Sequence, residues 1–416
     1  MKRIVLLLIA FIFFFEGCSG RLEDASNMET HDSSIVETER NFLADPLFDT
    51  AEYLAAYDVD NSVCFPMARL CETEGAYYGL CSSIMEQLMY MDKGSGVSGV
   101  LCAKAECEHN AESCNAYVGL GAGGFSVYDG CLYWVGDQIV EKTIVTGLWS
   151  MNLDGTDRVK IKDIDVELLN ATADNSIIRV HRGYLYLIGC EGVIENGKTI
   201  TRVTAQATPL DSSDEWVTIL DLEVDSGVTS DVKFVGNKVY IMIEKKEAEN
   251  RILTLYVWDS KTRELSICFE ENISFHAENM WVEEEGAYFA ASGASIGLYK
   301  FDFEKKTLEF CFGFEDPQYF GIEVGDNIAV GLGMTEHGDR LFWVKDFEGN
   351  TIYQEIFEVT DIENMQELGW SYVGGNQKHI FIALQSREVQ YMIEVPLAGG
   401  QEERILWKYV STGETV

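Results

Sequence analysis

The chain has 416 residues, with 69 acidic against 31 basic residues and a formal net charge of −38. Such an anionic surface repels phosphate backbones, so the composition excludes a nucleic-acid-binding protein. Prolines are few, at five, whereas glycines number 37. Aromatic residues recur in short alternating runs, and this combination favours many short strands joined by glycine turns.

The N-terminus has the order of residues found in a bacterial export signal. Two basic residues precede an apolar run, Ile4 to Phe15. This run is shorter than the ~20 residues that a transmembrane helix needs. Cys18 follows closely after Gly17, and the arrangement resembles the lipobox of bacterial lipoproteins, in which a lipid is attached to the cysteine sulfur. Phe15 and Glu16 depart from the aliphatic and small residues that this motif usually carries.

These features divide the chain into three predicted parts. Residues 1–17 form a lipoprotein signal peptide, residues 18–44 a flexible acidic tether, and residues 45–416 the folded part with its cysteine-rich N-terminal segment. The tether has few large apolar side chains, so it cannot bury enough surface to offset the entropy lost on ordering. We expect an extracytoplasmic protein attached to a bacterial membrane through a lipid on Cys18, with an ordinary cleaved signal or an uncleaved anchor as the alternatives.

One short pattern recurs through the folded part: a turn with Gly or Asn, a small or apolar residue, and then an aromatic strand. It is clearest in residues 129–134, DGCLYW, and in residues 182–186, RGYLY. The glycines of the seven copies lie at positions 75, 130, 183, 236, 286, 325 and 375. Recurrence at such intervals is the signature of a repeat architecture.

Two further patterns follow the first in several units. One reads LWSMN in residues 148–152 and LYKFD in residues 298–302, and the next reads TLEFCF in residues 307–312. Each unit thus holds three or four short strands over ~50 residues, the size of one propeller blade. We predict an all-β fold, a β-propeller with seven blades, and six or eight blades are the alternatives. A short helix is predicted before the ring, over residues 45–57.

The paired patterns Gly-x-Leu-Tyr and Leu-aromatic-x-Met-Asn-Leu-Asp-Gly, the latter in residues 148–155, resemble a known group of proteins. These are the extracytoplasmic β-propeller lipoproteins of anaerobic Gram-positive bacteria. The patterns are also similar to those of TolB-like and low-density-lipoprotein-receptor-type propellers. The resemblance covers residue ~70 to the C-terminus and implies the propeller fold. It implies no particular function, since propellers host many activities.

Three cysteines and one histidine fall within thirteen residues, at Cys102, Cys107, His109 and Cys114. Three thiolates and one imidazole would complete a tetrahedral zinc site. Disulfides are nevertheless the first interpretation, because exported proteins mature in oxidising compartments. Structural zinc and reduced structural thiols are the alternatives. A catalytic metal is not expected here, since four protein ligands leave no open coordination position.

The remaining cysteines are interpreted by their surroundings. Cys64, Cys71 and Cys81 lie upstream and could pair with the cluster or with one another. Cys268 and Cys311 occupy equivalent places in neighbouring units, within alternating apolar runs. We expect both of them to pack in the core.

The sequence has no complete nucleophile elbow, zinc-protease helix or phosphate-binding loop, so no catalytic residue is assigned. We predict a non-catalytic binding or scaffolding module at the cell surface. The alternative is an extracytoplasmic enzyme that acts on glycans or peptides with carboxylates in the central channel. A convergent group of carboxylates with a raised pKa would favour the enzyme, and a continuous apolar or aromatic patch would favour binding.

The expected partners follow from this interpretation. The membrane is reached through the lipid on Cys18, and the ligand is an unknown envelope protein or glycan. We expect a monomer that binds no nucleic acid and needs no cofactor, apart from the zinc alternative at the cysteine and histidine cluster.

Overall fold

The computed structural model describes residues 69–81, 86–109, 113–140, 143–164, 177–195, 198–211, 215–224, 228–247, 250–293, 296–314, 318–386, 388–399 and 402–410. The predicted signal peptide, Cys18, the tether and the predicted helix over residues 45–57 lie outside this part of the chain. None of the described helical structure has the length and apolar character needed to cross a membrane.

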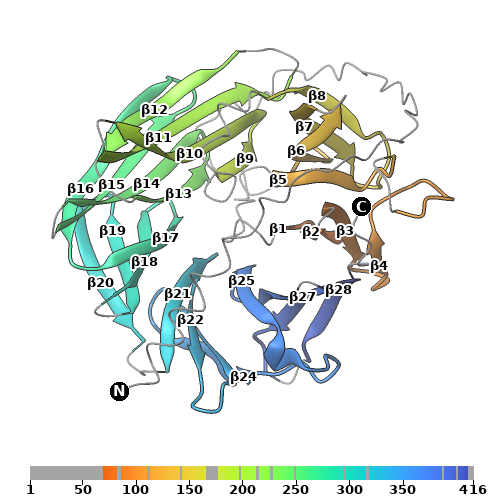
Figure 1. Cartoon of the computed structure of the whole chain (residues 1–416). Helices are drawn as coiled ribbons and strands as arrows, with labels where there is room; N and C mark the ends of the chain where they lie inside the picture. The colour runs from red at the N-terminus through yellow and green to blue at the C-terminus, as the bar shows by residue number, and fades with distance from the viewer. Residues whose placement is uncertain are drawn as a thin grey trace. The chain divides into compact units, whose positions relative to one another are not determined.

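The strands of the described chain form seven antiparallel blades arranged as a ring (Figure 1). Blade 1 contains β1 (Arg69–Glu72), β2 (Ala76–Cys81), β3 (Glu86–Asp92) and β4 (Ser98–Val100). Blade 2 contains β5 (Tyr117–Tyr128), β6 (Cys131–Val140), β7 (Thr143–Asn152) and β8 (Val159–Asp163). Blade 3 contains β9 (Ile177–His181), β10 (Tyr184–Glu195), β11 (Lys198–Pro209) and β12 (Val217–Val224).

The other four blades continue the same order. Blade 4 contains β13 (Val228–Val235), β14 (Lys238–Glu247), β15 (Asn250–Asp259) and β16 (Glu264–Ile273). Blade 5 contains β17 (His276–Val282), β18 (Gly286–Ser292), β19 (Gly297–Asp302) and β20 (Thr307–Gly313). Blade 6 contains β21 (Tyr319–Gly325), β22 (Ile328–Met334), β23 (Arg340–Asp346) and β24 (Thr351–Phe357). After the short 3-10 helix η3 (Met365–Glu367), blade 7 contains β25 (Gly369–Gly375), β26 (His379–Gln385), β27 (Val389–Pro396) and β28 (Arg404–Val410).

The recurrent glycine turn marks the same place in successive blades. Gly130, Gly183 and Gly236 lie between the first and second strands of blades 2, 3 and 4, with φ angles of 71°, 79° and 59°. This left-handed conformation costs glycine little because it has no Cβ. The two following sequence patterns coincide with the third and fourth strands. The predicted all-β propeller of seven blades is confirmed.

Middle strands of several blades are apolar on both faces, as in β18 and β26. Successive side chains of a strand point to opposite faces of its sheet. On β18, Phe289 belongs to a core cluster shared with Met242 of blade 4, and Tyr288 belongs to one shared with Val324 of blade 6. Each blade is therefore packed between two neighbours, with its first strand innermost (Figure 1).

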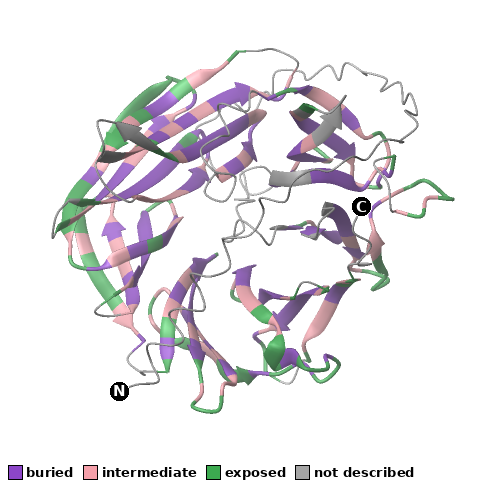
Figure 2. Cartoon of the chain, viewed as in Figure 1, coloured by how far each residue is buried: buried purple, intermediate pink, exposed green. Residues whose placement is uncertain are grey.

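In blades 3 to 7 the last strand forms the outer edge of its four-stranded sheet. Figure 2 shows exposed residues along β16 and β20, which have only one neighbouring strand each. Cys268 is partly buried against a core cluster, as expected. Cys311 is exposed on β20, so the prediction that it packs in the core is wrong. The alternating apolar pattern is present in this strand, but no further blade layer covers that face of the edge strand.

Among the described strands none is exchanged between blade 1 and blade 7, and side chains join these two blades. An apolar cluster joins Leu70 and Tyr77 of blade 1 to Phe381 and Trp407 of blade 7. The rings of Tyr77 and Phe381 meet edge to face, with their centroids 5.5 Å apart. Because all four strands of each blade are consecutive in sequence, the seam depends on these lateral contacts.

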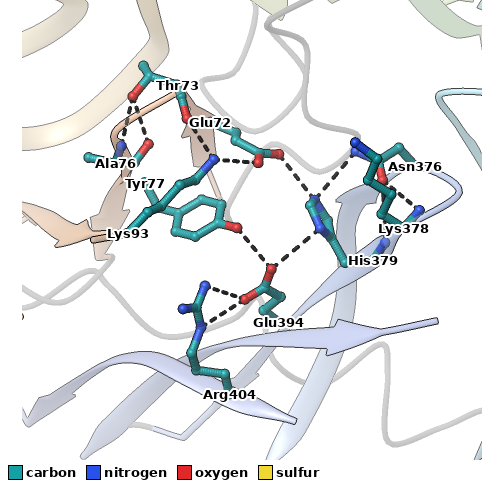
Figure 3. Close-up of polar contacts among 10 residues, drawn as sticks. All are labelled: Glu72, Thr73, Ala76, Tyr77, Lys93, Asn376, Lys378, His379, Glu394 and Arg404. Carbon is teal, nitrogen blue, oxygen red and sulfur yellow. Dashed lines mark hydrogen bonds and ion pairs between the residues drawn. The ribbon is translucent and has the colours of Figure 1, made fainter. Parts of the chain in front are cut away.

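Glu394 is the polar centre of this seam (Figure 3). Its carboxylate accepts a hydrogen bond of 2.9 Å from Tyr77 Oη and one of 2.9 Å from Arg404 Nε. His379 Nδ1 lies 3.4 Å from the same carboxylate. The Glu394 residue is only 9% exposed, so these contacts are made largely away from solvent.

Glu72 extends the network on the side of blade 1 (Figure 3). Its carboxylate oxygens lie 3.1 Å from His379 Nε2 and 2.6 Å from Lys93 Nζ. Burial opposes ionisation of Glu72, but the contacts with His379 and Lys93 outweigh it and lower the pKa of Glu72 to about 2. The ionised carboxylate of Glu72 therefore stabilises the seam above its usual pKa, and that contribution is lost as the pH falls toward 2.

We predict that Glu394→Ala lowers the free energy of unfolding by about 2 kcal/mol, because it leaves Tyr77 and Arg404 without their shared acceptor. Urea titration followed by tryptophan fluorescence measures the change. Asp221→Ala is the control, since it removes an exposed ion pair with Arg202 and should cost less than about 1 kcal/mol. Equal losses in the two variants would contradict the role given to Glu394.

Candidate functional sites

The structure brings the four sequence-predicted residues Cys102, Cys107, His109 and Cys114 into one group, called here the Cys–His cluster. Their donor atoms all lie within 4.8 Å of one another. His109 Nδ1 is 3.3 Å from Cys114 Sγ. The group lies in the connection between β4 and β5, whose described residues contain no strand.

None of the eight cysteines whose thiols the structure describes forms a disulfide in it, and the three of the Cys–His cluster are among them. Cys71, an upstream candidate for pairing, is buried and donates a hydrogen bond of 3.6 Å to the Phe125 carbonyl. Cys64 and the side chain of Cys81 lie outside the described part of the chain.

Backbone N–H groups are directed at the sulfur atoms of the Cys–His cluster. Those of Lys104 and Asn115 donate to Cys102, and that of Ala116 donates to Cys114. Burial disfavours the Cys102 thiolate, but the backbone donors outweigh it and lower the pKa of this thiol. At Cys114, burial dominates and raises the pKa of the thiol to about 12. The two thiols thus sit in different electrostatic surroundings within one small group.

The backbone of His109 adopts a left-handed conformation, with φ at 57°. Such a conformation is uncommon for residues other than glycine and persists where the surroundings hold it in place. Here the His109 carbonyl accepts a hydrogen bond from Gln87 of β3, and its ring lies against Cys114. The strained backbone therefore turns the imidazole toward the cysteines.

The Cys–His cluster rests on the turn between β7 and β8 of blade 2. Gly155 in this turn accepts hydrogen bonds on its carbonyl from Ala103 N, at 3.3 Å, and from Asn115 Nδ2, at 2.8 Å. Its φ is 81°, and an added Cβ would lie 3.2 Å from Cys102 N. Arg158 of the same blade donates to the Cys114 carbonyl at 2.9 Å. The connection is thereby docked onto blade 2.

A second group of titratable residues comes from the first strands of three successive blades. Asp231 on β13, Glu278 on β17 and Glu323 on β21 form what we call the inner acidic cluster. Asp231 accepts a hydrogen bond of 2.9 Å from the Met280 backbone N–H, and Asn279 donates to the Glu323 carboxyl group. The innermost strands of neighbouring blades are therefore linked through these side chains.

Electrostatics single out Glu323 within the inner acidic cluster. Burial, together with the negative charges of Glu278 and Asp231, raises the pKa of Glu323 to about 8. Lys233, which also lies on β13, acts in the opposite direction. At neutral pH the carboxyl group of Glu323 therefore keeps its proton, and it lies beside the carboxyl groups of Asp231 and Glu278.

Sequence reasoning did not find the inner acidic cluster. Its members are 47 and 45 residues apart, at positions 231, 278 and 323. The available signal was an acidic residue shortly before the recurrent turn in three successive repeats. The bulge in β17 between Ala277 and Met280 shifts the alignment of Glu278 relative to the other two, and such a bulge cannot be read from spacing.

Solved structures with a similar fold include peptidases of about twice the matched length. Acylaminoacyl peptidase from Pyrococcus horikoshii is 12% identical with a TM-score of 0.50, and the match covers 82% of this chain and 52% of that one. A structure of prolyl endopeptidases is 10% identical with a TM-score of 0.52, covering 82% and 48%. Prolyl oligopeptidase B from Galerina marginata is 10% identical with a TM-score of 0.50, covering 84% and 52%.

This chain therefore spans about half the length of those peptidases, and at these identities the likeness concerns the fold. Comparisons with protein-family models and with curated proteins find no match. The propeller expected from the repeats is thus supported by structural neighbours. The finer resemblance to lipoprotein and TolB-like propellers has no family match behind it.

Proposed function

We propose that this chain is a propeller at the outer face of a bacterial membrane, anchored through a lipid on Cys18, that binds a peptide or glycan at the inner acidic cluster. The convergence of Asp231, Glu278 and Glu323 from three successive blades carries this proposal. Glu278 is exposed, and Asp231 and Glu323 are partly exposed, so Glu278 is the member of the cluster that a ligand would contact first. Binding sites on repeat-built scaffolds commonly draw residues from several repeats in this way.

The chemistry of the inner acidic cluster favours ligands rich in hydrogen-bond donors. Ionised carboxylates accept hydrogen bonds from amino groups and hydroxyls, and a protonated carboxyl group can also donate one. Trp281 on β17 is partly buried, and Lys233 Nζ lies 5.9 Å from the centre of its ring. An indole face near carboxyl groups suits a sugar ring or the side chains of a peptide.

A second candidate function is hydrolysis of the same ligand class. Two neighbouring carboxyl groups with separated pKa values are the arrangement that many hydrolases use as general acid and as base or nucleophile. Glu323, with its raised pKa, would be the acid, and Asp231 or Glu278 the ionised partner. Solved structures with a similar fold include peptidases, which are named for their action on peptides. This likeness concerns the fold, and to that extent it supports hydrolysis as the second candidate.

Glu278→Gln tests binding at the inner acidic cluster. We expect at least a threefold weaker affinity for a fluorescent lysine-containing octapeptide or for a labelled chito-oligosaccharide, because one ionised acceptor is lost. Fluorescence anisotropy with the purified chain measures the change. Glu304→Gln, which alters an exposed turn residue of blade 5, is the matched control. If the two variants bind both probes as tightly as the parent chain does, the inner acidic cluster is not the ligand site.

Glu323→Gln tests the catalytic candidate. General acid catalysis contributes roughly 10²-fold or more, so we expect a loss of cleavage by at least that factor. The acid must be protonated, so the activity of the parent chain should fall as the pH rises through about 8. Mass spectrometry of incubated peptide and oligosaccharide pools detects the products. If the parent chain cleaves neither pool, hydrolysis is excluded and binding remains the function.

Cys18→Ser tests the anchor, because it removes the sulfur that the lipid would modify. We expect the parent chain in the membrane fraction of an expressing bacterium and the variant in a soluble or signal-retaining form. Fractionation with immunoblotting, together with the mass of the N-terminal peptide, measures both. An N-terminal peptide of the parent chain with an unmodified Cys18 would contradict lipidation.

A further inference from the structure

We propose that the Cys–His cluster binds one structural zinc ion that fixes the connection between blades 1 and 2. Three thiolates and an imidazole form one of the ligand sets typical of structural zinc sites. Soft sulfur ligands in such a set favour zinc over magnesium, calcium or manganese. With four protein ligands the ion has no open position, so its role is to hold the chain together.

The spacing of the donors agrees with a single ion between them. Zinc–sulfur bonds of ~2.3 Å in tetrahedral geometry place neighbouring sulfur atoms ~3.8 Å apart. The four donor atoms lie within 4.8 Å of one another, and His109 Nδ1 is 3.3 Å from Cys114 Sγ. Small side-chain adjustments would therefore place all four around one centre.

The number of donors favours a metal over a disulfide. A disulfide uses two sulfur atoms, so it would leave the third cysteine and His109 in the same pocket without a role. The buried thiol of Cys71 already contacts the Phe125 carbonyl and takes no part in the Cys–His cluster. A zinc ion would engage all three cysteines and the histidine together.

The surroundings of the Cys–His cluster resemble the supporting contacts that hold metal ligands in place. Backbone N–H groups of Lys104 and Asn115 donate to Cys102, and that of Ala116 donates to Cys114. The left-handed backbone of His109 orients its ring toward the sulfur atoms. These contacts come from the connection itself, so the ligand set is organised before an ion arrives.

The position of the Cys–His cluster explains what the zinc ion would stabilise. The fourth strand of blade 1, β4, has only three residues, and the described residues between Leu101 and Ala116 include no further strand. This segment touches blade 2 through Gly155 and Arg158. A zinc ion would close the segment on itself and keep it seated on blade 2. Arg158 would partly balance the net negative charge of a zinc ion with three thiolates.

Metal content and thiol state of the purified full chain test this inference. We expect about one zinc per chain by inductively coupled plasma mass spectrometry, and a native mass that falls by one zinc ion after acid treatment. Alkylation of the denatured, metal-free chain should then label Cys102, Cys107 and Cys114 as free thiols. A chain without zinc, or with a disulfide between any two of these cysteines, would overturn the proposal.

Variants separate the Cys–His cluster from other thiols. Cys107→Ser should lower the zinc content at least fivefold, whereas Cys311→Ser, which alters an exposed thiol on an edge strand, should leave it unchanged. His109→Ala should also lose zinc, and His109→Cys should restore it, because a fourth thiolate also completes the tetrahedral set. Zinc retained equally by Cys107→Ser and His109→Ala would place the ion elsewhere. If a variant fails to fold, the measurements on the parent chain still decide the question.

Discussion

Each blade must bury both faces of its sheet, and the rest of the structure depends on this constraint. Strands such as β18 and β26 are buried at nearly every position, so no face is left for solvent. A row of such blades would expose an apolar face at each end, whereas a ring covers all of them. No described strand is shared between blades 1 and 7, and within the described residues the ring is closed by the apolar and polar contacts between these two blades.

The repeat could be predicted from sequence because its signals are local. A glycine turn and the strand that follows it lie within a few residues of each other. Gly130, Gly183 and Gly236 have a positive φ, a conformation that favours glycine over other residues. The seam could not be predicted in the same way. Tyr77 and Glu394 are 317 residues apart, and nothing in their immediate neighbourhoods identifies them as partners. The exposure of Cys311 could not be predicted either, because an alternating apolar pattern does not distinguish an edge strand from a central one.

The same distinction separates the two candidate sites. The Cys–His cluster lies within one connection, so its ligand set could be named from spacing alone, although the choice between disulfide and metal could not. The inner acidic cluster combines residues of three repeats, which meet only when neighbouring blades pack side by side. A site assembled from Asp231, Glu278 and Glu323 depends on the order and tilt of blades, and on the bulge in β17 that repositions Glu278.

Blade 1 lies between the proposed anchor and the proposed zinc centre in the sequence, so it links the two proposals. Its β3 pairs with the short β4 and, through Glu86 and Gln87, with β5 of blade 2, so blades 1 and 2 share one continuous sheet. On its other side, the described residues of blade 1 meet blade 7 through the side-chain seam. If Cys18 carries a lipid, β1 is the described strand nearest to the anchor in sequence, so a pull transmitted along the chain would reach blade 1 before the other described blades. A metal-bound connection on one side and the network around Glu72 and Glu394 on the other would then resist separation of this blade from both neighbours.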